Sequence, residues 1–203
     1  MTTIQAVVFD IGGVLLDWDP DYLYRKLIPD LDHRQWFLSN VCTPEWNEAL
    51  DAGAPWDAAI AAKVAEFPAE AEAIHAYRSR WSEMLAGPIA GTVDIMAELR
   101  GQGVPLHAIT NFAAPTFRWC YAEFEFLRWF GEIVVSGECG VIKPDPAIYH
   151  LLLSRTGLQP AQCLFIDDRA DNIAAAQALG LQGHLFSQPA ALRADLVRLG
   201  LLG

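Results

Sequence analysis

From about residue 88 to the end of the chain, short β-branched and apolar runs alternate with helical segments, and this alternation constrains the fold most strongly. The predicted strands are Pro105–Ile109, Ile133–Val135, Cys163–Ile166 and Gly183–Phe186, and helices are predicted over 92–99, 147–155, 172–179 and 190–199. Such alternation is typical of a parallel sheet with helices on both faces. The sequence therefore predicts a doubly wound, Rossmann-like α/β domain.

Another strand is predicted over residues 4–10, where an apolar run ends in a single carboxylate. Asp10 follows Ala6-Val7-Val8-Phe9, and Gly12 and Gly13 then allow a tight backbone turn. A buried Asp10 costs free energy unless a cation or hydrogen-bond donors satisfy it. Taken alone, Asp10 is equally consistent with a residue that caps a turn.

Between about residues 20 and 88, apolar residues recur at helical spacing and no strand-like run interrupts them. The helical stretches are Tyr22–Leu27, Arg34–Leu38, Ala58–Phe67 and Ile74–Leu85, and Pro29, Pro44, Pro55 and Pro68 are interpreted as breaks. This pattern predicts an all-helical insertion. We therefore expect a core domain of residues 1–16 and 89–203, and a helical cap domain of residues 17–88.

Charge and cysteine content restrict the function classes. The 203 residues carry 14 basic and 25 acidic side chains, a net charge of −11, which disfavours binding to nucleic acid or to an anionic membrane. No apolar stretch is long enough to span a bilayer and no leader opens the chain, so we expect a cytoplasmic protein. The irregular spacing of the cysteines predicts reduced thiols rather than a zinc site or disulfides: Cys42, Cys120, Cys139 and Cys163.

Polar residues end three of the predicted strands, and right-handed crossovers place these ends at one edge of the sheet. Clustered carboxylates repel one another, and Mg²⁺ relieves that repulsion with oxygen ligands. A carboxylate can also attack phosphorus and form an aspartyl-phosphate, while hydroxyl and ammonium groups stabilise the phosphoryl oxygens. The converging residues are Asp10, Thr110, Asn111, Asp167 and Asp168, with Lys143 in the loop after the remaining central strand.

Four segments resemble the motifs of the haloacid dehalogenase-like superfamily, in matching order and spacing over nearly the whole chain. They are Phe-Asp-Ile-Gly-Gly-Val at 9–14, Ile-Thr-Asn at 109–111, Ile-Lys-Pro-Asp-Pro-Ala-Ile-Tyr at 142–149 and Phe-Ile-Asp-Asp-Arg-Ala-Asp-Asn at 165–172. The helical insertion resembles the alpha-helical cap of the first subfamily. The chain is also similar to sugar-phosphate phosphatases of the superfamily that have glucose 1-phosphate among their substrates.

The resemblance implies Mg²⁺-dependent hydrolysis of a small phosphorylated metabolite, sugar phosphate-like, through an aspartyl-phosphate. It assigns Asp10 as nucleophile and metal ligand. The other implied metal ligands are the carbonyl of Gly12, Asp168 and Asp167; Thr110 and Asn111 hold the phosphoryl group, and Lys143 contacts both Asp10 and the phosphate.

Asp171 and Asn172 follow this metal site in the sequence, and two interpretations of them stay open. They are either the N-cap of the next helix or residues that orient Asp168 or the waters of the metal.

One position departs from the phosphatase pattern of the superfamily, in which an aspartate two residues after the nucleophile acts as general acid and base. Here that position is Gly12, and the substitute proton donors are Asp17 and Asp19, unless they are only hinge caps. Metal-independent 2-haloacid dehalogenases also lack that aspartate. A dehalogenase and a non-catalytic binder of a phosphorylated metabolite therefore stay as alternatives, although the acidic pair at 167–168 favours the phosphatase.

The tryptophans of the helical insertion are expected to pack in its interior for the most part. Trp18 at the hinge and Trp46 after a Cys-Thr-Pro break are the better candidates for walls of a substrate pocket. Neither the substrate within this class nor the oligomeric state follows from the sequence.

Overall fold

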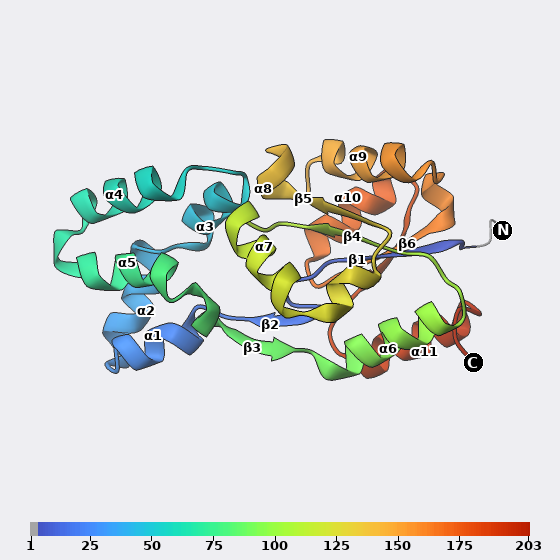
Figure 1. The fold of residues 1–203 in the computed structure, drawn as a ribbon, viewed down its shortest axis with the longest axis horizontal. Helices are drawn as coiled ribbons and strands as arrows, with labels where there is room; N and C mark the ends of the chain where they lie inside the picture. Colours follow the sequence, from blue (N-terminus) through green and yellow to red (C-terminus); the bar gives the residue numbers. More distant parts are fainter. Residues whose placement is uncertain (1–3) are drawn as a thin grey trace.

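Five parallel strands form the central sheet of the computed structural model, which describes residues 4–203 (Figure 1). The sheet order is β5-β4-β1-β6-β7, with β1 (Ala6–Phe9), β4 (Leu106–Thr110), β5 (Glu132–Val135), β6 (Cys163–Asp167) and β7 (Gln182–Leu185). The predicted doubly wound α/β architecture is confirmed. Residues 1–3 of the predicted core domain lie outside the described residues.

Successive residues of the central strand face different helices, as the two-residue period of a strand requires. Val7 and Phe9 belong to the apolar cluster on the face of α6 and α11, whereas Val8 belongs to the cluster on the face of α9 and α10 (Figure 1). All of β1 is buried, which is typical of a parallel strand covered on both sides. The helices beside the sheet are α6 (Ala90–Gly101), α7 (Ala114–Glu123), α9 (Pro146–Thr156), α10 (Ala170–Ala178) and α11 (Pro189–Arg198).

A group of helices lies to one side of the sheet, and we call it the helical segment (Figure 1). It consists of α1 (Asp21–Leu27), α2 (Leu31–Asn40), α3 (Pro44–Asp51), α4 (Trp56–Glu66), α5 (Ala71–Ser79) and the 3₁₀ turns η1 (Pro68–Glu70) and η2 (Trp81–Met84). Aromatic rings in tilted and edge-on contact pack in its interior, with the Tyr24 and Phe37 centroids 4.7 Å apart. The break interpreted at Pro44 lies just before it, between α2 and α3, and Pro44 is the first residue of α3, a position that a proline ring suits. Helix α3 itself was not predicted.

Two short antiparallel strands connect the helical segment to the sheet. They are β2 (Leu16–Trp18) and β3 (Leu85–Pro88), paired with each other. The expectation that no strand interrupts the insertion is therefore wrong at β3. The domain boundaries expected after residues 16 and 88 both fall in this two-stranded ladder.

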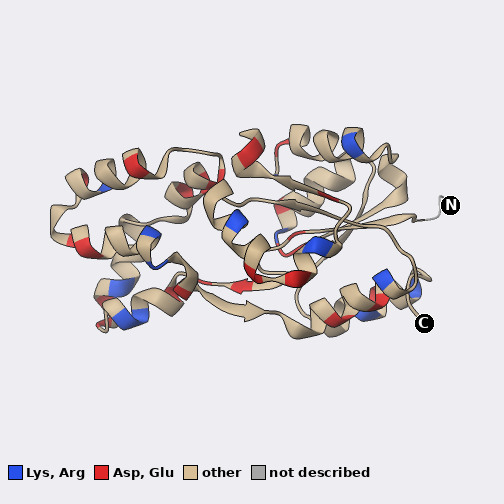
Figure 2. Ribbon diagram, in the orientation of Figure 1, with Lys and Arg blue, Asp and Glu red and all other residues tan. Residues whose placement is uncertain are grey.

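The remaining short elements are η3 (Glu125–Trp129), α8 (Ser136–Cys139) and η4 (Pro160–Gln162). Within residues 4–203, no helix combines the length and the apolar character needed to cross a membrane. All four cysteines are free thiols, as expected. Lys and Arg are interspersed with Asp and Glu on the helical segment and around the sheet (Figure 2).

Candidate active site

Asp10 follows the central strand β1 directly, between the carboxyl ends of β4 and β6. The winding of the sheet reverses at this strand, and α/β proteins bind ligands at such a switch point. The residue is 7% exposed. Its Oδ1 accepts a hydrogen bond from the Ile11 N–H at 2.6 Å, and its Oδ2 lies 2.7 Å from Lys143 Nζ. Burial raises the pKa of Asp10, and Lys143 opposes that rise.

Lys143 places its ammonium between two carboxylates. Its Nζ lies 2.7 Å from Asp10 Oδ2 and 2.7 Å from Asp167 Oδ2. Burial alone lowers the pKa of Lys143, but the two carboxylates outweigh it and the net pKa is raised. The Asn111 side chain holds the Lys143 backbone, accepting from its N–H at 2.7 Å and donating to its carbonyl at 3.0 Å. Asn111 therefore fixes Lys143 with the same amide that the resemblance assigned to the phosphoryl group.

Three carboxylates cluster at this lysine, two of them in contact with it, and oxygens of Asp10, Asp167 and Asp168 lie within 4.8 Å of one another. One ammonium against three carboxylates leaves two negative charges, which match a divalent cation. Burial and the charge of Asp167 raise the pKa of Asp168, as expected where carboxylate repulsion is not relieved. Oxygen ligands with this charge are those that Mg²⁺ prefers. The donor set therefore suits Mg²⁺.

The two residues of the acidic pair differ in their contacts. Asp167 is fully buried, and its oxygens accept hydrogen bonds from the Arg169 N–H at 2.8 Å, from Lys143 Nζ at 2.7 Å and from Asn172 Nδ2 at 3.0 and 3.1 Å. Asp168 is exposed and lines the cavity beside Asp10. It is therefore the member of the pair with oxygens available to a metal.

Asp171 and Asn172 occupy different environments. Asn172 is buried and donates to Asp167, so it belongs to the carboxylate cluster. Asp171 is exposed and pairs with Arg169, 2.7 Å from its Nη2. The N-cap interpretation is wrong for both, because Arg169 occupies that position of α10.

The two glycines that follow Asp10 in the sequence, Gly12 and Gly13, have different constraints. Gly13 has φ 71°, and a Cβ there would collide with the Asp168 carboxylate. Gly12 is not among the glycines with positive φ, and a Cβ there would meet no heavy atom within 4 Å. Only Gly13 therefore needs to be glycine for reasons of space and backbone conformation.

Thr110 ends β4, beside β1, and is fully buried. Within residues 4–203 its Oγ1 has no hydrogen-bond partner. An unsatisfied buried hydroxyl is costly, so this group is available to a ligand at the strand ends.

A cavity of about 510 Å³, which we call the reactive cavity, contains Asp10, Lys143 and Asp168 on its sheet side. Asn47, Asp51 and Tyr77 line it from the helical segment, and Trp18 lines it at the hinge. Trp46 instead packs against Tyr77, with ring centroids 4.9 Å apart, and is not among the residues that line the cavity.

The hinge acids lie away from this cavity. Asp17 accepts hydrogen bonds from the Tyr22 hydroxyl at 3.0 Å, and Asp19 accepts one from the Asp21 N–H at 2.8 Å. Neither is among the lining residues of the reactive cavity. Their contacts agree with the hinge-cap interpretation.

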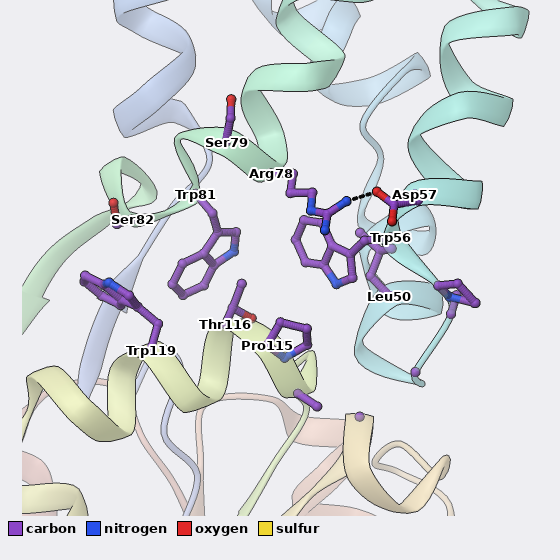
Figure 3. A pocket seen from close by; sticks show the side chains of 15 residues that line it. Leu50, Trp56, Asp57, Arg78, Ser79, Trp81, Ser82, Pro115, Thr116 and Trp119 are labelled. Carbon is purple, nitrogen blue, oxygen red and sulfur yellow. Dashed lines mark hydrogen bonds and ion pairs between the residues drawn. The ribbon is translucent and has the colours of Figure 1, made fainter.

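A second cavity, of about 630 Å³, lies between the helical segment and α7. We call it the tryptophan cavity, because Trp56, Trp81 and Trp119 of α7 line it (Figure 3), with the Trp81 and Trp119 rings packed edge-on at 6.3 Å between centroids. A small cavity of about 80 Å³ shares Trp56, Trp81 and Thr116 with the tryptophan cavity. It shares Gly12, Asn47 and Asp51 with the reactive cavity, among others. The three cavities therefore form a row that leads from the buried carboxylates to an aromatic wall.

A family model described as haloacid dehalogenase-like hydrolase matches residues 4–180. This match includes all the strand ends that bear the carboxylates, Thr110 and Lys143. The chain belongs to the haloacid dehalogenase-like hydrolase family. The resemblance noted in the sequence is thereby confirmed, and the protein is a hydrolase.

This hydrolase is 30% identical over 192 residues to a sesquiterpene phosphatase from Aspergillus oryzae, and the alignment covers 91% of each chain. The magnesium complex of a related family enzyme from Bacteroides thetaiotaomicron has a TM-score of 0.72 and 18% identity, covering 97% of this chain and 100% of that one. L-2-haloacid dehalogenase from Xanthobacter autotrophicus, with chloropropionic acid covalently bound, has a TM-score of 0.65 and 22% identity, covering 97% and 83%. The two structures share the fold with this hydrolase.

Sequence reasoning missed Asp51 and Asn47, which line the reactive cavity from α3. A signal for them was present. Thr43 caps α3 by accepting a hydrogen bond from the Trp46 N–H at 3.2 Å, and Pro44 follows at the first helical position. A cap residue followed by proline is a helix start, and it would have placed Asp51 two turns further along.

Proposed function

We propose that this hydrolase is a Mg²⁺-dependent phosphatase that cleaves a phosphomonoester through an aspartyl-phosphate at Asp10. The observation that carries the proposal is the cluster of three carboxylates with one buried lysine, which leaves two negative charges for a divalent cation. The sesquiterpene phosphatase relative supports the same reaction class. A dehalogenase that attacks carbon without metal would have no use for this additional negative charge.

Asp10, Asp168 and the Gly12 carbonyl would hold Mg²⁺, and Asp167 would orient Lys143 from behind. The bound ion supplies positive charge to the phosphoryl oxygens. Lys143 supplies another, because its ammonium already contacts Asp10 at 2.7 Å. The unpartnered hydroxyl of Thr110 donates to a further phosphoryl oxygen. Such fixed charges and donors provide most of the catalysis of phosphoryl transfer.

In the first step, an oxygen of Asp10 forms a bond to phosphorus while the bond from phosphorus to the ester oxygen breaks. The ester oxygen keeps the electron pair and leaves as an alcohol once protonated. Water then attacks the phosphorus of the aspartyl-phosphate, and the bond to Asp10 breaks to release phosphate. The cap domain of residues 17–88, which contains the helical segment, would exclude bulk water from the reactive cavity during both steps.

The alcohol part of the substrate would lie toward the helical segment. Two kinds of alcohol are considered there, a sugar and an apolar alcohol. The sequence resemblance favours a sugar phosphate. The aromatic lining of the tryptophan cavity (Figure 3) and the sesquiterpene phosphatase relative favour an apolar alcohol. Buried aromatic surface binds apolar groups better than hydroxyl-rich ones, so we expect the higher kcat/KM for the apolar ester.

Phosphate release from p-nitrophenyl phosphate, glucose 1-phosphate and an isoprenoid monophosphate, with and without Mg²⁺, tests the proposal. We expect release that depends strictly on Mg²⁺. Chloride release from 2-chloropropionate without metal would instead identify a dehalogenase. Thermal stabilisation by the esters without any release of phosphate would identify a binding protein.

A further inference from the structure

The open space beside Gly12 marks the position of the absent acid, and Asp51 borders that space from α3. Gly12 and Asp51 both line the reactive cavity and the small cavity next to it. A Cβ added at Gly12 would meet no heavy atom within 4 Å. The first atom of a side chain at position 12 would therefore stand in open space, and Asp51 of the helical segment lines the same two cavities.

Hydrogen bonds from two parts of the molecule fix the position of Asp51. Asn47 Nδ2 donates to its Oδ2 at 2.8 Å, and the Tyr77 hydroxyl donates to Asn47 Oδ1 at 2.6 Å. On the sheet side, Ser136 Oγ donates to the Asp51 carbonyl at 2.6 Å and accepts from the Phe112 N–H at 2.8 Å. Asn47 therefore holds the carboxyl group of Asp51, and Ser136 holds its backbone relative to the strand ends.

Burial is the largest influence on the pKa of Asp51, because the cations across the cavity are paired with other carboxylates. Lys143 and Arg169 across the cavity already contact other carboxylates. Burial raises the pKa of Asp51 to about 7, opposed by the Ala113 N–H and Asn47 and assisted by Glu48. A carboxylic acid of this kind holds a proton near neutral pH. The titratable and charged groups around it are Glu48 on α3, Tyr77 on α5, and Asp10, Lys143, Asp168 and Arg169 across the reactive cavity.

We propose that Asp51 is the proton donor that replaces the acid absent at Gly12, a role that rests on the phosphatase function proposed above. When the bond between phosphorus and the ester oxygen breaks, the Asp51 proton moves to that oxygen, which leaves a neutral alcohol and the Asp51 carboxylate. In the second step, this carboxylate takes a proton from the water that attacks phosphorus. Asp51 is then protonated again, and Asp10 is a carboxylate.

The role predicts a dependence on the leaving group that a structural role would not produce. We would measure kcat/KM of wild type and Asp51→Asn for esters from nitrophenyl to alkyl phosphates, with Mg²⁺ present. Asp51→Asn should lose about 10²–10⁴-fold on alkyl phosphates, the usual contribution of a positioned acid, and less than about tenfold on p-nitrophenyl phosphate, whose leaving group needs no proton. The matched control is Asp17→Asn, which should leave both rates unchanged.

A second measurement uses wild type alone and therefore does not depend on how the variant folds. Its kcat/KM for alkyl phosphates should fall as the pH rises through the Asp51 titration, relative to kcat/KM for p-nitrophenyl phosphate. Equal losses of Asp51→Asn on all esters, or a leaving-group dependence in Asp17→Asn instead, would overturn the role of Asp51 alone. Wild type that releases phosphate from no ester would overturn the phosphatase function and this role with it.

Discussion

Asp10 and Asp51 line the same cavity from two parts of the molecule that position their side chains in different ways. Backbone pairing at the strand ends holds Asp10, Thr110 and Asp167, and these three residues are at most 7% exposed. Asp51 depends on side-chain donors: Asn47 donates to its carboxylate, and Ser136 of α8 donates to its backbone carbonyl. The sheet thus provides a rigid reactive centre, and the helical segment provides groups whose placement depends on tertiary packing.

Removal of the proposed nucleophile should abolish phosphatase activity. Asp10→Asn replaces the attacking oxygen by an amide of the same size, so we expect a loss of about 10⁴-fold or more in kcat. Circular dichroism should show an intact fold. Asp32→Asn on the exposed face of α2 is the control, and activity of Asp10→Asn within tenfold of wild type would contradict the nucleophile assignment.

Lys143→Ala should lower kcat by about 10²–10³-fold, since it removes the ammonium from between two carboxylates and from the phosphoryl oxygens. Lys143→Arg should not restore the rate, because a planar guanidinium does not replace a compact ammonium in a buried site. Lys26→Ala, at a surface ion pair with Glu83, is the matched control. Full rescue by arginine would mean that the strand ends are less rigid than the distances indicate.

The two members of the acidic pair should separate in a titration with Mg²⁺. Asp168→Ala should raise the Mg²⁺ concentration for half-maximal rate by about 10–100-fold, because Asp168 has oxygens free for the metal. Asp167→Asn should change the melting temperature more than the Mg²⁺ requirement, since its oxygens hold Lys143 and Asn172. Identical titrations for both variants would contradict this division.

In the tryptophan cavity, Trp119→Ala should raise KM for an isoprenoid monophosphate about five- to tenfold, the effect of losing part of one aromatic contact. KM for glucose 1-phosphate should stay within twofold. Trp36→Ala is a closely matched control, because Trp36 is 44% exposed against 42% for Trp119 and lies on α2. Equal changes for both esters would remove the tryptophan cavity from substrate binding.

The smallest effect concerns stability. Because the pKa of Asp51 is raised from 3.8 to about 7, its contribution to the free energy of unfolding is fully present below pH 3.8 and is lost as the pH rises through about 7. Asp51→Asn removes this dependence. Its melting temperature relative to wild type should therefore rise between about pH 5 and pH 8.5, by the equivalent of about 1–3 kcal/mol. A difference that does not change with pH would show that Asp51 is not buried as described.

The same contrast explains what could be predicted from the sequence. Asp10, Thr110 and Asp167 each end an apolar run, and parallel topology alone brings such ends together.

β3 was missed because its Gly87 and Pro88 have low strand propensity, and it forms only by pairing with β2. α7 was missed because its aromatic residues lack a clear helical period. Asp51 required knowledge of where α3 packs, which depends on contacts far apart in the sequence, such as the bond to Ser136.

Every covalent path from the helical segment to the sheet passes through β2 and β3, two neighbouring strands. On the other side, α3 lies beside α8 (Figure 1), joined by the hydroxyl of Ser136 and supported by the Arg169–Glu48 ion pair at 3.2 Å. A rotation about the ladder would break these polar contacts first, and each is worth only about 1 kcal/mol when water replaces it. Release of alcohol and phosphate would then require the helical segment to move through solvent. Turnover of a rapidly cleaved ester should therefore slow as the solvent becomes more viscous.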